Sequence, residues 1–167
     1  MWNMLTIFLL GKGESLVSGC ITVKIKKMDS NSFALPTYAT AASAGVDLYA
    51  DLKEPLIVNP GENVKIPTGL AIELPSQYVV ALIFARSGLA SCYGLGLTNG
   101  VGVIDSDYRG EIQVLVQNLG HHRVKINPGD RIAQMVFMPV LKALFEEVSE
   151  LQETPRGAGG FGSTGLK

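Results

Sequence analysis

The residue types best suited to chemistry stand close together in residues 102–110, where Asp105 precedes Tyr108 by three positions. Glycines bound this segment, and the alternation of residues 111–117 predicts a strand after it, so we expect a tight hairpin. A carboxylate held beside free backbone amides can act as a general base on a water molecule, and the ring can cradle a flat ligand. A hairpin carboxylate is more often a solvated turn residue, so this segment is informative only together with others.

A second segment, Arg86-Ser87-Gly88, follows the apolar strand predicted at residues 79–85. Arginine presents a planar fork of donors that suits phosphate oxygens, and glycine lets the backbone approach an anion closely. We expect Ser87 to cap a short helix that runs through residues 89–93, with amides at the helix start facing a ligand. The alternative is an ordinary turn with a surface arginine.

The glycine-rich residues 156–165 form a third segment of this kind. Their backbone amides can wrap phosphate groups, with Arg156, Ser163 and Thr164 as further donors. Phe161 is a single ring among residues that cannot form a core, and it is placed to stack on a nucleobase. The alternative is a linker that carries an incidental phenylalanine.

Four other polar residues have simpler interpretations when each is taken alone. Asp47 precedes a strand, which is typical of an acidic residue in a turn. The adjacent Asp130 and Arg131 are most simply interpreted as a structural ion pair. Gln134 points from a predicted strand and can donate its amide to a phosphate. All five segments in one small chain predict a site that hydrolyses a nucleotide.

Composition sets limits on the class of protein. A chain of 167 residues with 47% hydrophobic residues is long enough for one domain with a real core. The net charge of −1 argues against nucleic acid as a partner. Cys20 and Cys92 lack disulfide or zinc spacing, which predicts free thiols. We interpret the adjacent His121 and His122 as solvated loop residues.

Periodicity and turn residues predict an all-β fold, a β-sandwich, jelly roll or barrel. Asn59-Pro60-Gly61 and Asn127-Pro128-Gly129 are both typical of type II turns. Residues 141–151 are ambiguous between strand and helix. The predicted strands are residues 22–27, 45–50, 56–58, 63–66, 69–74, 78–84, 111–117, 123–126 and 132–138.

The two ends of the chain differ from the middle. The apolar run at residues 4–10 is too short to span a bilayer, and no basic residue precedes it as in a signal peptide. We therefore interpret residues 1–20 as a poorly ordered extension, residues 21–151 as the β domain, and residues 152–167 as a mobile tail. We expect a cytoplasmic protein without a membrane partner.

Five ordered segments resemble the motifs of the trimeric deoxyuridine triphosphate nucleotidohydrolases, the dUTPases. The resemblance covers almost everything after residue 20, and only the extension is foreign to it. The segments are residues 42–48, 86–90, 99–110, 129–134 and 156–165.

The resemblance implies a jelly-roll-like, distorted β-barrel subunit that forms a homotrimer. Each active site would be shared between subunits, and the glycine-rich tail of one subunit would close over the site of a neighbour. The reaction would convert dUTP and water to dUMP and pyrophosphate, which supplies a precursor of dTTP and keeps uracil out of DNA.

The resemblance also implies a role for each candidate residue. Asp105 would be the general base, Tyr108 would pack under the deoxyribose, and a weaker expectation places Gln113 near the nucleotide. Mg²⁺ would bind through the substrate phosphates, with Asp47 touching it only through water. Asn99, Val103 and Ile104 would read the uracil edge; Arg86, Ser87, Gly88 and Gln134 would hold the α and β phosphates; and Arg156, Ser163 and Thr164 would hold the γ phosphate.

Two alternatives belong to other classes. A dCTP deaminase shares the implied fold, but that family resembles Arg-Ser-Ser at the second motif and uses a glutamate, so Gly88 and Asp105 speak against it. A nucleotide-sensing module without catalysis would keep the tail and lose the base, whereas Asp105 is present.

Overall fold

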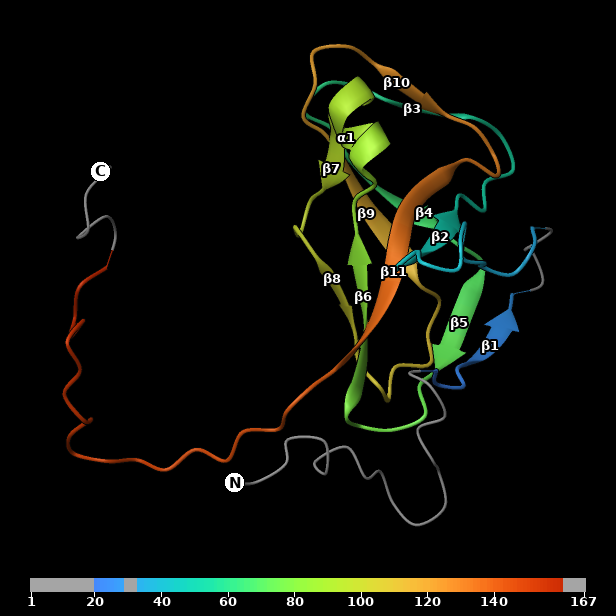
Figure 1. Ribbon diagram of the computed structural model, residues 1–167. Coiled ribbons are helices and arrows are strands. Elements are labelled where there is room, and N and C mark those ends of the chain that lie inside the picture. Colours follow the sequence, from blue (N-terminus) through green and yellow to red (C-terminus); the bar gives the residue numbers. More distant parts are fainter. Residues whose placement is uncertain (1–19, 29–32, 161–167) are drawn as a thin grey trace.

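Antiparallel pairing joins the strands of the described residues into four small sheets that wrap around one core (Figure 1). The computed structural model describes residues 20–28 and 33–160, which form short strands and one helix. The elements are β1 (Lys24–Lys27), β2 (Val46–Tyr49), β3 (Leu56–Val58), β4 (Asn63–Pro67), β5 (Leu70–Glu73), β6 (Val79–Phe84), α1 (Ser87–Tyr93), β7 (Leu95–Leu97), β8 (Gly102–Ile104), β9 (Gln113–Asn118), β10 (Val124–Ile126) and β11 (Arg131–Pro139).

The two larger sheets have the orders β2-β11-β6-β8 and β4-β9-β7, and the pairs β1-β5 and β10-β3 complete the barrel. Neighbours in these sheets are distant in sequence, as in a jelly roll, because each strand crosses to another sheet after a short turn. The predicted fold class, an all-β jelly-roll-like distorted barrel, is confirmed.

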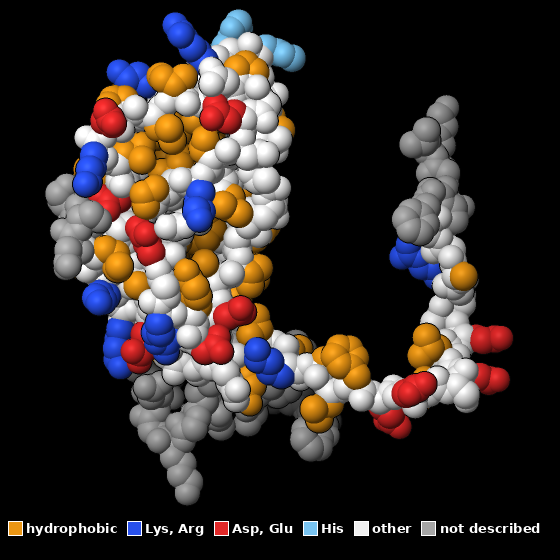
Figure 2. Space-filling model, turned by 180° about the vertical axis from the view of Figure 1, so that it is seen from behind, with side chains coloured by type: hydrophobic (Ala, Val, Ile, Leu, Met, Phe, Trp, Pro, Cys, Tyr) orange, Lys and Arg blue, Asp and Glu red, His pale blue; other side chains and the backbone are white. Residues whose placement is uncertain are grey.

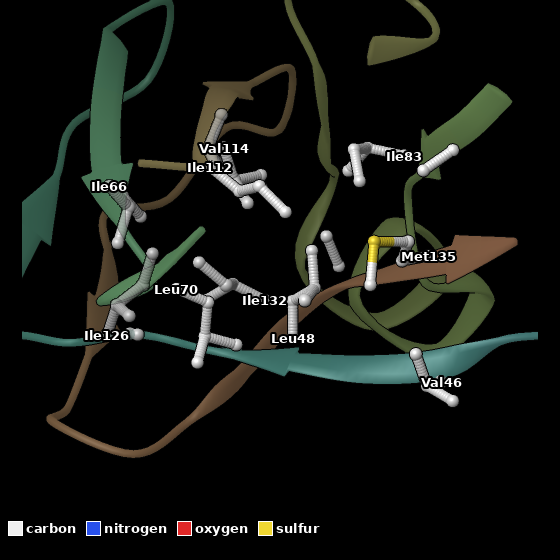
Figure 3. Close-up of a cluster of buried hydrophobic side chains, with 14 of the residues drawn as sticks. Val46, Leu48, Ile66, Leu70, Ile83, Ile112, Val114, Ile126, Ile132 and Met135 are labelled. Atoms are coloured by element: carbon white, nitrogen blue, oxygen red, sulfur yellow. The ribbon is translucent and has the colours of Figure 1, made fainter. Parts of the chain in front are cut away.

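The core lies where the inner faces of the two larger sheets meet (Figure 3). Strand alternation produces it: in β2 the side chains of Val46 and Leu48 are buried, whereas Asp47 and Tyr49 are only half-buried. Leu48 and Ile66 are fully buried, and Met135 of β11 packs into the same cluster. The outward residues of the same strands are therefore free to serve the site.

Both predicted Asn-Pro-Gly turns are present. Gly61 and Gly129 have φ values of 77° and 80°, the left-handed conformation that glycine adopts at the third position of such a turn. Each turn closes with a backbone hydrogen bond, from Glu62 to Asn59 and from Asp130 to Asn127. The carboxylates of Glu62 and Asp130 also accept a bond from the backbone N–H of the same asparagine.

The predicted cap of the helix is wrong. Arg86 is the N-cap residue of α1, with extended backbone and no side-chain capping bond, and Ser87 is already helical. The helix ends at Gly94, whose φ of 70° directs its N–H to the carbonyls of Leu89 and Ala90. Gly94 then accepts a hydrogen bond from the backbone of Leu119, which ties the helix to the end of β9.

Asn118 is a fully buried polar residue that organises the loop after β9. Its amide nitrogen donates to the carbonyl oxygens of Val58 and His122, at 3.0 Å and 2.8 Å. Its side-chain oxygen accepts from the backbone N–H of Gly120 at 2.9 Å. One side chain thus links β3, β9 and the loop that follows.

Three differences from the predicted elements concern segments with weak patterns. Strands β7 and β8 are not among the predicted strands, because three residues that include a glycine show no alternation. The predicted hairpin of residues 102–117 is also wrong: β8 pairs with β6, whereas β9 pairs with β4 and β7, so the connecting loop crosses between sheets.

The third difference concerns the segment after β11, residues 141–151, whose pattern was ambiguous between a strand and a helix. It forms neither, and residues 141–160 extend away from the barrel (Figures 1 and 2). Leu144 and Phe145 are 99% and 97% exposed, and Figure 2 shows hydrophobic and acidic side chains along this arm. The described residues include no helix that is long and apolar enough to cross a membrane.

Candidate active site

Three of the five motif segments meet at one end of the β2-β11-β6-β8 sheet. In β11, Gln134 lies opposite Asp47 of β2 on one side and opposite Phe84 of β6 on the other. The side-chain amide of Gln134 donates to the carbonyl of Ala85 at 3.0 Å, immediately before Arg86. The register therefore brings together the motif segments of residues 42–48, 86–90 and 129–134.

Asp47 and two arginines form an ionic cluster at this point. Its carboxylate contacts the Nε atom of Arg86 at 2.9 Å and the Nη1 atom of Arg131 at 3.1 Å, one oxygen to each. The Asp47 side chain is only 16% exposed, so these pairs are shielded from water more than surface ion pairs are. Arg86 and Arg131 thus stand side by side, which is an arrangement suited to phosphate oxygens.

The predicted ion pair between Asp130 and Arg131 is wrong. The Asp130 carboxylate accepts from the backbone and side-chain N–H groups of Asn127, at 2.7 Å and 3.2 Å. Arg131 instead pairs with Asp47, which is distant in sequence. Arg131 is a residue of the cluster that our sequence reasoning missed, because its acidic neighbour offered a nearer partner.

The backbone next to Arg86 is open to a ligand. Ser87 and Gly88 are exposed in the first turn of α1, and a Cβ atom built at Gly88 would have no neighbour within 4 Å. A groove of about 530 Å³ adjoins the cluster and has a cationic lining. Its charged lining residues are Arg86, Arg123, Lys125, Asp130 and Arg131.

Asp105 and Tyr108 lie in a turn beyond the end of β8. The backbone N–H of Tyr108 donates to the carbonyl of Asp105 at 3.1 Å, and the Arg109 guanidinium donates to the carbonyls of Ser106 and Tyr108. Among the described residues, the exposed Asp105 carboxylate has no hydrogen-bond or ion-pair partner. A carboxylate on a held backbone that keeps both oxygens available can accept a proton from a water molecule.

The Tyr108 ring is held although it is 44% exposed. Its hydroxyl donates to the backbone carbonyl of Glu111 at 3.0 Å. The Glu111 carboxylate accepts from the backbone N–H of Gly69 at 2.8 Å and from the side-chain amide of Gln113 at 3.0 Å. Glu111 thus contacts both residues, Gln113 through its carboxylate and Tyr108 through its carbonyl.

The three residues predicted to read a base lie along the same edge of the sheet. β8 is an edge strand, and Val103 on it is 60% exposed. Ile104 is half-buried against the core, and Asn99 is exposed in the turn that precedes β8. A flat ligand can therefore lie along β8 and reach backbone groups that no neighbouring strand occupies.

One protomer does not bring Asp105 and the arginine cluster together. Ile104 pairs with Ala81, so Asp105 lies level with Val80 at the far end of β6 from Arg86. At about 3.3 Å per residue, the chain from Val80 to Arg86 can span up to about 20 Å. A separation of this size exceeds the reach of an arginine side chain, so the two groups of one protomer cannot contact the same phosphate.

The motif segment of residues 156–165 is only partly described. Arg156 is exposed, and its guanidinium donates to the carbonyl of Gly159 within a local turn. The structure does not bring Arg156 to Asp105 or to the arginine cluster. The predictions for Phe161, Ser163 and Thr164 lie outside the described residues, as do those for residues 1–19.

The donors near the arginine cluster could contact a hydrated cation through Asp47. No group of three or more histidine, cysteine or acidic side chains converges within residues 20–28 and 33–160. Asp47 is the acidic member of the arginine cluster, and both of its oxygens already accept bonds from arginine. Each oxygen keeps a lone pair for a water molecule on such a cation.

The fold and the site together define a β-barrel protein whose basic cluster, free carboxylate and fixed ring suit a phosphorylated, flat ligand. The family model described as dUTPase matches residues 31–165. The deoxyuridine 5'-triphosphate nucleotidohydrolase of Desulfitobacterium hafniense (strain DSM 10664 / DCB-2) is 63% identical over 132 residues, which are 79% of this chain and 87% of that protein. The chain belongs to the dUTPase family.

Solved structures agree with this fold. A mutant of the Staphylococcus bacteriophage 80alpha dUTPase with dUpNHpp has a TM-score of 0.74 at 24% identity, over 87% of this chain and 99% of that one. A mutant dUTPase of phage phi11 of S. aureus, described with a structural Mg(II) ion, has a TM-score of 0.70 at 22% identity, over 80% and 100%. The predicted resemblance to the dUTPases is confirmed.

Proposed function

We propose that this chain is a hydrolase that converts dUTP and water to dUMP and pyrophosphate. The observation that carries the proposal is the free Asp105 carboxylate beside the anchored Tyr108 ring in a chain of the dUTPase family. A dCTP deaminase and a nucleotide sensor without catalysis are the alternatives. The unpartnered carboxylate favours an enzyme over a sensor, because a sensor needs no base.

The reaction is a displacement at the α-phosphorus. Asp105 takes a proton from a water molecule, the water oxygen forms a bond to the α-phosphorus, and the bond from that phosphorus to the bridging oxygen breaks. The electron pair leaves with pyrophosphate, and the proton remains on the Asp105 carboxylate. Positioned base catalysis of this kind contributes roughly 10²–10⁴-fold.

The nucleoside half of the substrate lies along the edge strand β8. Asn99 and the backbone of Val103 and Ile104 read the uracil edge, and exposure of this strand supports that role. Tyr108 packs under the deoxyribose, where a ribose 2′-hydroxyl would clash with the fixed ring. Gln113 approaches the nucleotide from the side on which Glu111 orients it.

The triphosphate half lies against the arginine cluster. Arg86, Ser87 and Gly88 hold the α and β phosphates, together with Gln134, whose amide keeps one N–H beyond its bond to Ala85. Arg156, Ser163 and Thr164 hold the γ phosphate from the tail, and Phe161 stacks on the base. Arginines stabilise the charge that develops on the leaving pyrophosphate.

Mg²⁺ would be held mainly by the substrate phosphates, with Asp47 as the side chain that would face its water shell. When bound, the cation would supply charge neutralisation on the phosphate oxygens. The absence of a dense acidic cluster in the described residues is compatible with this arrangement. The structural Mg(II) ion of the phage phi11 protein supports a role for this cation in the family.

The active protein is a homotrimer whose sites are shared between subunits. The separation of up to about 20 Å between Asp105 and Arg86 along β6 supports a site that takes these residues from different copies. The exposed apolar side chains of the arm, such as Leu144 and Phe145, support its contact with another copy. The tail then closes over the site of a neighbour.

Pyrophosphate release from dUTP, dCTP, UTP and dTTP in the presence of Mg²⁺ tests the proposed activity. We expect release from dUTP and little from the other three nucleotides. Ammonia release from dCTP would establish the deaminase instead. Binding of dUTP without release of pyrophosphate would establish the sensor.

A further inference from the structure

Gly110 lies where any larger residue would collide with the Tyr108 ring. A Cβ atom built at Gly110 would meet the hydroxyl oxygen, and would lie 2.5 Å from the Cζ atom and 2.9 Å from the Cε2 atom. Real Cβ atoms do not approach other atoms so closely. The backbone of Gly110 is outside the left-handed region, so the ring, and not the backbone conformation, requires glycine here.

The Tyr108 hydroxyl is held by Glu111, the residue after Gly110. It donates to the carbonyl of Glu111, whose carboxylate is tied to the backbone N–H of Gly69 between β4 and β5. The neighbouring Ile112 is fully buried and exchanges backbone hydrogen bonds with Leu70 and Thr68. The carbonyl that receives the hydroxyl therefore belongs to a rigid part of the barrel.

We propose that Gly110 and Glu111 are positioning residues that fix the Tyr108 ring and thereby set the preference for deoxyribose over ribose nucleotides. This inference rests on the proposed function, because it concerns the ring that packs under the sugar. A half-exposed ring that loses the space at Gly110 or the bond to Glu111 must move, and it can then make room for a 2′-hydroxyl. With both in place, the ring stays where that hydroxyl would clash.

Gly110→Ala tests whether the ring needs the space that glycine leaves at this position. The new methyl group must displace the ring, since the ring is the mobile partner in the collision. We expect the ratio of kcat/KM for dUTP to that for UTP to fall by roughly tenfold, the usual effect of a small steric change in a pocket. Gly96→Ala is the matched control, because its methyl group would meet only the Leu119 Cδ1 atom at 3.1 Å, on a side chain that is 66% exposed.

Three further variants test whether the effect passes through the ring. Tyr108→Phe keeps the ring and removes its bond to Glu111, so the ratio should fall. Glu111→Ala should lower it as well, and Glu111→Gln, which keeps an oxygen for the Gly69 N–H, should restore most of it. In a Tyr108→Ala background, Gly110→Ala should change the ratio no further.

The outcomes separate this inference from the proposed function. A wild-type protein that releases no pyrophosphate from dUTP would overturn both. A selective wild-type protein whose folded Gly110→Ala variant keeps the full ratio would overturn the inference alone. If Gly110→Ala does not fold, an unchanged ratio in Tyr108→Phe and Glu111→Ala would overturn it equally.

Discussion

Asp105 combines two properties that a general base needs, a fixed backbone and a carboxylate without a partner among the described residues. Asp105→Asn keeps the shape and most hydrogen bonds of the side chain but cannot accept the proton. We expect kcat for dUTP to fall by roughly 10²–10⁴-fold, with little change in the affinity for dUpNHpp. Near-normal turnover in this variant would exclude Asp105 from the role.

Asp47 pairs with two adjacent guanidinium groups in a partly buried setting. Asp47→Asn leaves Arg86 and Arg131 side by side without the negative charge between them. We expect the free energy of unfolding to fall by about 1.5–3 kcal/mol, the usual range for hydrogen bonds to charged groups, as measured by urea denaturation. Asp107→Asn, an exposed change in the turn after β8, is the control, and equal stability of the two variants would contradict the ionic cluster.

The resemblance to the dUTPase motifs singled out Asp105, Arg86 and Gln134, and their roles stay predictions. The pairing of Asp47 with Arg131 could not be predicted from the sequence, because it depends on the register of β2 against β11. The adjacent Asp130 offered Arg131 an obvious partner that the Asn127 turn had already taken.

At the scale of elements, the side-chain amide of Asn118 joins β3, β9 and the following loop. Asn118→Ala leaves two carbonyls and one N–H without this partner in a buried place. We expect a loss of about 3 kcal/mol in the free energy of unfolding. His122→Ala keeps the backbone carbonyl that accepts from Asn118, so the free energy of unfolding should fall far less in this variant. Similar losses in both variants would contradict the role of the Asn118 side chain.

The pairing of β1 with β5 has a dependence on pH. A hydrogen bond from Lys24 at 2.8 Å, together with its charge, lowers the pKa of Glu73. A lowered folded-state pKa means that the stabilisation is present above the ordinary carboxyl pKa and is lost as pH falls through the lowered value. In an NMR titration, Lys24→Met should move the pKa of Glu73 upward. An unchanged titration would show that the pair is absent in solution.

Elements with clear alternation were predictable, and the exceptions have physical reasons. Residues 46–49 and 113–118 show one buried face, so their strands follow from the pattern. β7 and β8 are too short to show a period, and their pairing partners are set by the barrel rather than by the local sequence. Residues 141–151 hold apolar side chains but contact no sheet within one protomer, so neither predicted element forms.

At the scale of the whole molecule, the described part of the arm, residues 141–160, contributes no side chain to the barrel core. A truncation after Leu151 should therefore keep the circular dichroism spectrum and melting temperature of the full chain. It removes Arg156 together with the predicted donors outside the described residues. We expect kcat for dUTP to fall by at least roughly 10²-fold, because misplaced phosphates lose the benefit of orientation. A truncated protein with the full rate would show that the tail is only a linker.

We propose that each site hydrolyses dUTP with Asp105 from one copy and the arginine cluster from another. The direct test is coexpression of Asp105→Asn and Arg86→Ala chains under two different tags, followed by isolation of the mixed oligomer and measurement of pyrophosphate release. We predict that either variant alone is nearly inactive and that the mixed oligomer regains a clear part of the wild-type rate, because some sites combine an intact Asp105 with an intact Arg86. A mixed oligomer as inactive as its parents would contradict the shared site.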